Sequence, residues 1–263
     1  MTALSMAVRD SNTMLRRNLR HMLRYPSMTV MLAGMPVIFL LLFVYVFGGT
    51  LGAGLGGPGG GRAEYVAYVT PGILLMAVAL GAAGTAISVA MDMTEGIMAR
   101  FRTMAIFRPA VLTGHVLGSL LQTLLALAVT LAVAVVIAFR PDATPVEWLA
   151  AAGLLAFITL AVTWLSVAFG LVSKTVEAAS NLPTPLVFLP FLGSGFVPTG
   201  SMPTGLRWFA EYQPFTPIIE TVRGLLLGTA IGDSALWAVA WCAAITLAGS
   251  LWSRRLYNRD PIR

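Results

Sequence analysis

Residues 65–91 read YVAYVTPGILLMAVALGAAGTAISVAM and contain no charged side chain. An apolar run of this length is typical of a helix that crosses the roughly 30 Å hydrocarbon core of a bilayer. Tyr65 and Tyr68 suit the membrane interface at its start, and Pro71-Gly72 interrupts the run. Small residues at spacings of three and four, which permit close helix packing, follow in the second half of the run: Gly81, Gly84 and Ser88.

Five further apolar stretches indicate that lipid is the solvent in which the chain folds. Hydrophobic residues make up 57% of the chain and charged residues 11%, whereas soluble domains average roughly 45–50% and about 25%. Cys242 is the only cysteine, which excludes an internal disulfide framework and a thiolate metal cluster. The net charge of +6 does not indicate nucleic-acid binding, because the basic residues gather at the ends of the apolar stretches.

The pattern therefore predicts an all-α integral membrane protein with one transmembrane domain over residues 1–263. Residues 3–24 place apolar and arginine side chains on different helical faces, which predicts an amphipathic interfacial helix. Six transmembrane helices are expected, separated by a charged region at 92–108 and by a segment at 198–232 that is too polar to cross the membrane. The expected spans are 27–47, 65–91, 111–139, 148–172, 181–197 and 235–252.

Glycine and proline mark the breaks in this pattern. The glycine-rich residues 48–61 predict a flexible loop on the outer side. The fifth span contains Pro183, Pro185 and Pro190, so it survives in lipid only where neighbours or water satisfy the freed backbone carbonyls. Within 198–232 we expect a short re-entrant helix at the outer interface. Thr216 would be its cap and Pro217 its first residue, Glu220 would lie in its first turn and Gly228 would end it.

The distribution of basic residues predicts the orientation. Thirteen Lys and Arg residues fall on the side that holds both chain ends and the 92–108 region, and four fall on the other side. Because cytoplasmic loops carry an excess of Lys and Arg, both termini are expected in the cytoplasm, in agreement with an even number of spans.

Two motifs resemble one family of transport proteins. The inner segment MDMTEGIMARFR at 91–102, continuing to Arg108-Pro109 and Gly114, is similar to the coupling-helix region of type-2 ATP-binding-cassette (ABC) exporter permeases. The outer block runs from FVP at 196–198 through SMP at 201–203 and QPFTP at 213–217 to ETVRGL at 220–225, and it resembles their re-entrant segment. The resemblance covers the whole chain and is greatest to the daunorubicin-resistance-like drug-export branch.

The resemblance implies a bacterial plasma-membrane permease domain that pairs with a second copy or a homologue. Each half would contact one of two cytoplasmic ABC ATPase subunits, and the ATPase would drive the membrane halves between states. The residues on or beside the docking helix would be Glu95, Gly96, Arg100, Phe101 and Arg102. A short helix with an aromatic ring and paired arginines can seat in a groove on a partner. The alternative is that the arginines only bind lipid headgroups and fix the topology.

The outer segment also has two interpretations. Glu220 and Arg223 are three residues apart on one helical face and could form a pair that closes the outer end of the pathway; alternatively, the helix only packs at the interface. By family resemblance the second and fifth spans line the pathway, and the candidate pathway residues on these spans are Met76, Thr85, Phe188 and Phe191. Polar residues inside other spans, such as Gln122 and Thr123, more often hold helices together.

The chain shows no energy-converting chemistry of its own. It has no G-x-x-x-x-G-K-[ST] motif, so we expect no enzyme activity and no cofactor or metal on this chain, with ATP and Mg bound by the partner ATPase. A pathway with almost no fixed charge favours hydrophobic or amphipathic drugs or lipids as exported cargo. Polysaccharide or glycolipid export by the same architecture remains open. An ATP-independent secondary transporter would need an intramembrane ion site or an inverted repeat, and neither is recognisable.

Overall fold

The computed structural model describes residues 26–54, 61–96 and 108–258, and the predicted amphipathic helix at 3–24 lies outside this part of the chain. The described residues form no strand, and 83% of the structure is helical. The all-α prediction is therefore confirmed. The elements in chain order are α2 (Pro26–Leu42), η1 (Phe43–Phe47), α3 (Gly48–Gly54), α4 (Arg62–Thr94), α6 (Arg108–Ile137), α7 (Pro145–Val172), α8 (Val176–Asn181), α9 (Thr184–Phe188), η2 (Thr199–Ser201), α10 (Thr204–Tyr212), α11 (Phe215–Leu227) and α12 (Ser234–Asn258).

Five helices of the described chain are long and apolar enough to cross a membrane. They correspond to five of the six predicted spans: Val30–Gly54, Arg62–Thr94, Leu112–Ile137, Pro145–Val172 and Ser234–Asn258. The remaining predicted span, the fifth at residues 181–197, is not a continuous helix. It contains the end of α8, then α9, and then a run of turns. Its three prolines explain this difference, because each removes a backbone donor and clashes with the preceding turn.

The first span is longer than the sequence predicts. Residues 48–61 were expected to form a loop, but α2 continues through the π-helical turn η1 into α3 and ends at Gly54. The prediction is wrong for residues 48–54. A glycine in a helix interior costs only about 1 kcal/mol relative to alanine, whereas a backbone group left unsatisfied in hydrocarbon costs several kcal/mol. Helix is therefore favoured wherever the chain is still within the membrane.

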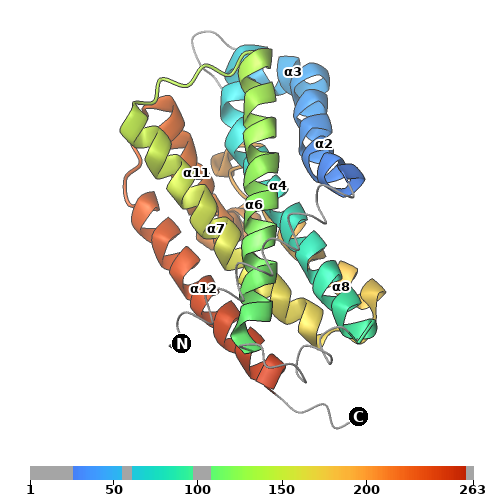
Figure 1. Cartoon of the computed structure of the whole chain (residues 1–263). Helices are drawn as coiled ribbons and strands as arrows, with labels where there is room; N and C mark the ends of the chain where they lie inside the picture. The colour runs from blue at the N-terminus through green and yellow to red at the C-terminus, as the bar shows by residue number, and fades with distance from the viewer. Residues whose placement is uncertain (1–25, 55–60, 97–107, 259–263) are drawn as a thin grey trace.

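Helix α4 lies at the centre of the bundle, with α6 and α7 in front of it and α2 and α12 towards the outside (Figure 1). In its most apolar window 67% of residues are buried, compared with 17% in the first span and 17% in α12. The core accordingly combines α4 with buried side chains of α7 and α11, among them Ile73, Ile158 and Ile218. The C-terminal ends of α4, α7 and α12 and the start of α6 lie at one end of the bundle (Figure 1).

Glycines allow the closest helix contacts. A Cβ atom on Gly170 of α7 would lie 2.7 Å from the Ala86 carbonyl oxygen and from Val89 Cβ of α4. On α12, Gly249 lies against the backbone of Trp164 and Leu165, and the nearby Ser253 hydroxyl donates a hydrogen bond of 3.0 Å to the Trp164 carbonyl. Small residues thus bring both α4 and α12 close to α7, as is common for helices packed in lipid.

The helix after residue 214 differs from its prediction at its start and agrees with it at its end. Helix α11 begins at Phe215, so Thr216 is not its cap, and Pro217 and Glu220 lie later in the helix than expected. The Thr216 hydroxyl donates instead to the Ala210 carbonyl. Gly228 ends the helix in a left-handed conformation with φ 64°, as predicted.

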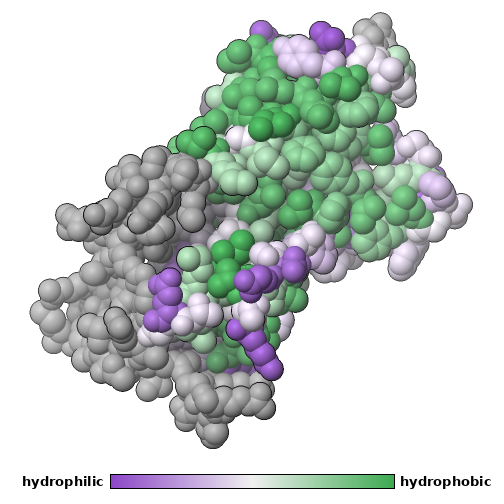
Figure 2. Space-filling view, turned by 90° about the vertical axis from the view of Figure 1, so that its right-hand side faces the viewer, coloured by the Kyte–Doolittle hydropathy of each residue, from purple (hydrophilic) through white to green (hydrophobic). Residues whose placement is uncertain are grey.

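The coloured part of the surface in Figure 2 is mostly apolar, with hydrophilic side chains at its upper rim and towards its lower part. Large apolar side chains are exposed on several helices: Val136 is 85% exposed, Leu149 74% and Leu236 72%. Monomeric soluble proteins rarely expose so much continuous apolar surface. Lipid is the medium that accounts for it.

Two glycines of α7 provide a test of the packing. Gly170→Ala places a methyl group against the α4 backbone and should lower stability by about 1–3 kcal/mol. Gly153→Ala is the matched control, because a Cβ atom there meets nothing within 4 Å. We expect the detergent-solubilised G170A protein to unfold at a clearly lower temperature than wild type and G153A to be unchanged or slightly more stable. Equal midpoints for the two variants would contradict the close α4–α7 contact.

Candidate functional site

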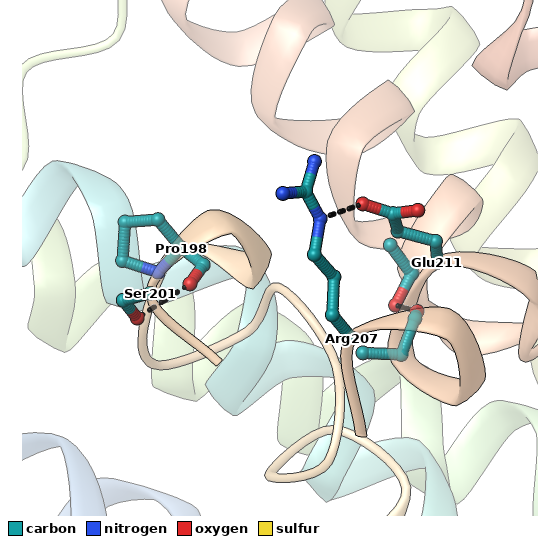
Figure 3. A network of polar contacts seen from close by, with 6 residues as sticks. Pro198, Ser201, Arg207 and Glu211 are labelled. Carbon is teal, nitrogen blue, oxygen red and sulfur yellow. Dashed lines mark hydrogen bonds and ion pairs between the residues drawn. The ribbon is translucent and has the colours of Figure 1, made fainter. Parts of the chain in front are cut away.

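The candidate site is built around the interrupted segment, defined as residues 182–203 between α8 and α10. It contains α9, the turns at 189–196 and the short helix η2. The Ser201 hydroxyl donates to the Pro198 carbonyl at 2.7 Å, and beyond the segment Arg207 pairs with Glu211 on α10 at 2.7 Å (Figure 3). That ion pair is exposed and therefore contributes little to stability.

Side chains from other elements satisfy backbone carbonyls of the interrupted segment. The Gln213 side chain, which is buried, donates through Nε2 to the Leu189 carbonyl at 3.1 Å. Tyr65 of α4 donates its hydroxyl to the Phe196 carbonyl at 3.4 Å. Arg223 Nη2 donates to the Ser194 carbonyl at 2.6 Å. The predicted need of a broken helix in lipid for neighbouring donors is thus met by side chains of α4, of α11 and of the residues that precede α11.

Arg223 is the donor that ties three elements together. Its Nη2 also donates to the Tyr68 carbonyl of α4 at 3.1 Å, and its guanidinium carbon lies 3.9 Å from the centre of the Tyr68 ring. Tyr68 lies within the continuous helix α4, three residues before Pro71. The planar fork of arginine suits two carbonyls and a ring at once. Arg223 thus joins α11 to the proline turn of α4 and to the interrupted segment.

The predicted partners Glu220 and Arg223 have different hydrogen bonds in the structure. Glu220 accepts a hydrogen bond of 3.1 Å from the Ser234 hydroxyl at the start of α12, and Arg223 donates to the two carbonyls described above. No ion pair joins the two side chains in the part of the chain that the structure describes. Both residues nevertheless lie on α11, and each fastens it to a different span.

Tyr65 and Tyr68 also differ from their expected role as interfacial anchors. The Tyr65 side chain is completely buried, and Tyr68 lies beneath the Arg223 guanidinium. Close by, a Cβ atom on Gly72 would lie 2.5 Å from the Gly195 carbonyl oxygen. Pro71 and Gly72 were expected to interrupt this span, but α4 is continuous through them. They mark instead the place where the interrupted segment meets α4 backbone to backbone.

Aromatic side chains gather beside this contact. We call them the phenylalanine cluster, which comprises Phe39 of α2, Phe43 and Phe47 of η1, and Phe191 and Phe196 of the interrupted segment. The rings of Phe191 and Phe196 are parallel, with centroids 4.2 Å apart, and Phe43 lies 4.6 Å from Phe196. π-helical turns are frequent at functional sites, and here one places two aromatic rings in the cluster.

The predicted pathway residues do not all come together. Phe191 belongs to the phenylalanine cluster, while Phe188 is 56% exposed and lies apart from the cluster's ring contacts. Met76 and Thr85 are buried within the bundle on α4, and the Thr85 hydroxyl donates to the Gly81 carbonyl of its own helix. Thr123 of α6 packs on Gly81, as expected for a residue that holds helices together. The pathway role of these residues stays a prediction.

At the opposite end of α4, the predicted coupling residues are only partly described. Glu95 is exposed and is the C-terminal cap of α4, and Gly96 follows in a left-handed conformation with φ 70°. A left-handed glycine at this position ends a helix at little steric cost. Arg100, Phe101 and Arg102 lie outside the described residues. The structure thus places Glu95 and Gly96 at the surface where α4 ends.

Sequence reasoning missed three features of the site: the donor role of Gln213, the carbonyl contacts of Arg223 and a buried pair between Asp92 and His115. A general signal existed for the first two, because polar side chains that follow a proline-broken segment are available to satisfy its carbonyls. The third carried no such signal, because Asp92 lies three residues before the cap of α4 whereas His115 lies seven residues after the start of α6, so no regular spacing relates them.

The fold and site define a multi-pass α-helical membrane protein with an interrupted segment packed against α4. The ABC-2 type transporter family matches residues 10–227, and the chain belongs to this family.

Two curated relatives are similar over most of the chain. The daunorubicin resistance ABC transporter permease protein DrrB1 of Streptomyces coeruleorubidus is 29% identical over 225 residues, which cover 85% of this chain and 77% of the relative. The probable doxorubicin resistance ABC transporter permease protein DrrC of Mycobacterium tuberculosis is 23% identical over 177 residues, covering 67% of this chain and 64% of the relative. Both names describe permease subunits, in agreement with the resemblance noted from the motifs.

Arg223→Met tests the importance of the guanidinium contacts. The substitution keeps an unbranched side chain but leaves two carbonyls without their donor, and an unsatisfied buried group costs about 1–3 kcal/mol. We expect the free energy of unfolding to fall by about 2 kcal/mol or more. The loss should appear as a lower thermal midpoint and as earlier proteolysis of the interrupted segment. Arg207→Met is the matched control: it removes an exposed arginine and its surface ion pair, which is worth at most about 1 kcal/mol. Identical behaviour of R223M and R207M would contradict the proposed contacts.

Proposed function

We propose that this chain is the membrane permease subunit of an ATP-driven exporter that moves hydrophobic or amphipathic drugs or lipids out of the cell. Membership of the ABC-2 type transporter family is the observation that carries the proposal. The two relatives named for anthracycline resistance support a drug as cargo. The absence of a P-loop motif from the sequence supports a separate ATPase as the source of energy.

The inner face of this permease is the end of the bundle where α4, α7 and α12 finish. The excess of basic residues at this end supports a cytoplasmic location for it and for both termini. Residues 92–108 connect α4 to α6 at this end, and the exposed Glu95 can be reached from the cytoplasm. We place the ATPase contact here, with Glu95 and Gly96 at its edge and Arg100, Phe101 and Arg102 within it.

The interrupted segment completes the sixth crossing in this proposal. Residues 176–197 return the chain from the inner end towards the outer end through α8, α9 and the turns that follow. Helices α10 and α11 then form the re-entrant part, which is too short to cross on its own: α11 has 13 residues, or about 20 Å at 1.5 Å per residue. Glu220 and Arg223, each fastened to a different span, would hold the outer end closed.

The cargo class follows from the chemistry of the site. The spans α4 and α7 carry no charged side chain over residues 65–91 and 148–172. The phenylalanine cluster adds aromatic rings, against which aromatic molecules pack favourably. A solute gathered from the bilayer would meet apolar walls and aromatic rings, which suits a lipophilic aromatic drug better than a sugar chain.

The complete transporter would contain two permease halves, this chain with a second copy or a homologue, and two cytoplasmic ABC ATPase subunits. ATP and Mg²⁺ would be bound by the ATPase subunits. The permease would supply the pathway and the surface through which ATPase movement reaches it.

Co-purification with the partner ATPase tests this function. We expect the chain to form a complex whose ATPase activity rises severalfold with a lipophilic aromatic compound such as an anthracycline, and the chain alone in liposomes to transport nothing. Glu95→Ala should weaken assembly with the ATPase while membrane insertion persists, because it removes an exposed carboxylate at the docking edge. Glu211→Ala, an exposed carboxylate on α10, is the matched control. Active transport by the chain without an ATPase would refute the proposal.

Phe191→Ala tests the cargo site. The substitution removes a ring from the phenylalanine cluster, and loss of one aromatic contact worth about 0.5–1.5 kcal/mol should weaken drug binding roughly 2- to 10-fold. Drug-stimulated ATPase activity, measured as the drug concentration for half-maximal stimulation, reports this change. Phe188→Ala removes an exposed ring outside the cluster and should leave that concentration unchanged. If F188A and F191A shift it equally, the cluster is not the cargo contact.

A further inference from the structure

Asp92 and His115 form a buried pair between the inner ends of α4 and α6. His115 Nε2 lies 3.0 Å from Asp92 Oδ2, and the two residues are 8% and 7% exposed. A carboxylate only accepts hydrogen bonds, so the imidazole Nε2 is the donor. Asp92 lies three residues before the cap of α4, and His115 lies seven residues after the first residue of α6. The pair therefore joins the last turn of α4 to the second or third turn of α6, close to the segment that connects the two helices.

Many of the described side chains next to the pair are apolar. A cluster of buried side chains fills the same region of α4, α6, α7 and α12: Val89, Leu112, Val116, Trp164, Val167 and Tyr257. A charged or strongly polar pair in such a place gains little net stability, because desolvation offsets the attraction. What it does supply is a fixed geometry, since removing either partner takes a buried hydrogen bond of 3.0 Å away from the other. The pair thus specifies how the two helix ends align.

A second contact fixes the same two helices deeper in the membrane. Thr123 of α6 packs directly on Gly81 of α4, where there is no room for a Cβ atom. Gly81 is about 16 Å along α4 from Asp92, and Thr123 is about 12 Å along α6 from His115, at 1.5 Å per residue. Two contacts at this separation prevent the helices from splaying or rotating about a single point. The close contact of Gly170 with Val89 also fastens α4 to α7 near this end.

We propose that Asp92 and His115 are positioning residues that hold the inner ends of α4 and α6 as one rigid unit. A displacement of residues 95–108 then moves α4 and α6 together. It thereby also moves Pro71 and Gly72, which lie towards the other end of α4. Without the pair, the same displacement separates the two helix ends, and the rest of α4 and α6 does not move with them. The inference rests on the proposed function for the source of the displacement, but the rigid unit itself is a property of this chain.

The first measurement concerns the chain alone and does not depend on an ATPase. Spin labels on the exposed residues Thr94 and Leu117, in a protein whose Cys242 is replaced by Ser, report the distance between the two helix ends by EPR. We expect a narrow distribution that broadens in Asp92→Asn and in His115→Gln. The exchanged double variant D92H/H115D restores both partners and should narrow the distribution again. Glu211→Gln removes the exposed ion pair on α10 and should change nothing.

The second measurement uses the complex of the full chain with its ATPase. Asp92→Asn and His115→Gln should assemble and keep basal ATPase activity but transport at least 5-fold less drug per ATP hydrolysed, and D92H/H115D should recover at least half of this loss. An unchanged EPR distribution and an unchanged transport ratio in both single variants would overturn the inference. So would loss of function that the exchanged variant fails to rescue while it folds normally. If the complex does not form even with the unaltered chain, the proposed function fails, and the EPR result alone decides the rigid unit.

Discussion

The need to satisfy backbone carbonyls in lipid governs this structure more than any other single requirement. Continuous helices meet it internally, but the interrupted segment cannot, because its prolines remove donors and its turns expose acceptors. The missing donors come from Tyr65 of α4, from Gln213 just before α11, and from Arg223 of α11. The position of α11 against the bundle follows from this need, since its arginine has to reach two carbonyls and one aromatic ring at once.

A buried or half-buried arginine is expensive in an apolar bundle, and its cost constrains the backbone and side chains around it. Arg223 meets this cost by donating to the Tyr68 carbonyl of α4 and to the Ser194 carbonyl of the interrupted segment. The adjoining contact of Gly72 with Gly195 brings these carbonyls within reach. Moving the guanidinium elsewhere would leave a charge without partners and carbonyls without donors. Hydrogen bonds of Arg223, and not apolar packing alone, therefore hold α11 against α4 and the interrupted segment.

The sequence predicted the spans well because long uncharged runs have few alternatives to helix in lipid. Five of the predicted spans are helices, including the central α4. It failed where side chains carry no periodic signal. The glycines at 48–54 suggested a loop because helix propensity was considered without the effect of the membrane. The start of α11 was predicted two residues too late, because Pro214 and Phe215 do not form a standard helix cap. The partners of Arg223 could not be read at all, because they are backbone atoms of segments 29 and 155 residues away.

The contact between Gly72 and Gly195 has a mechanical consequence. Helices that pack through side chains interlock by ridges and grooves, and turning one against the other means climbing over those ridges. Two glycines offer no ridge, so the segments touch at a smooth point about which they can swivel. Around that point the Arg223 and Tyr65 hydrogen bonds act as short tethers, which permit rotation and resist separation. The contact between α4 and the interrupted segment is thus a tethered pivot, and a side chain at either glycine would lock it.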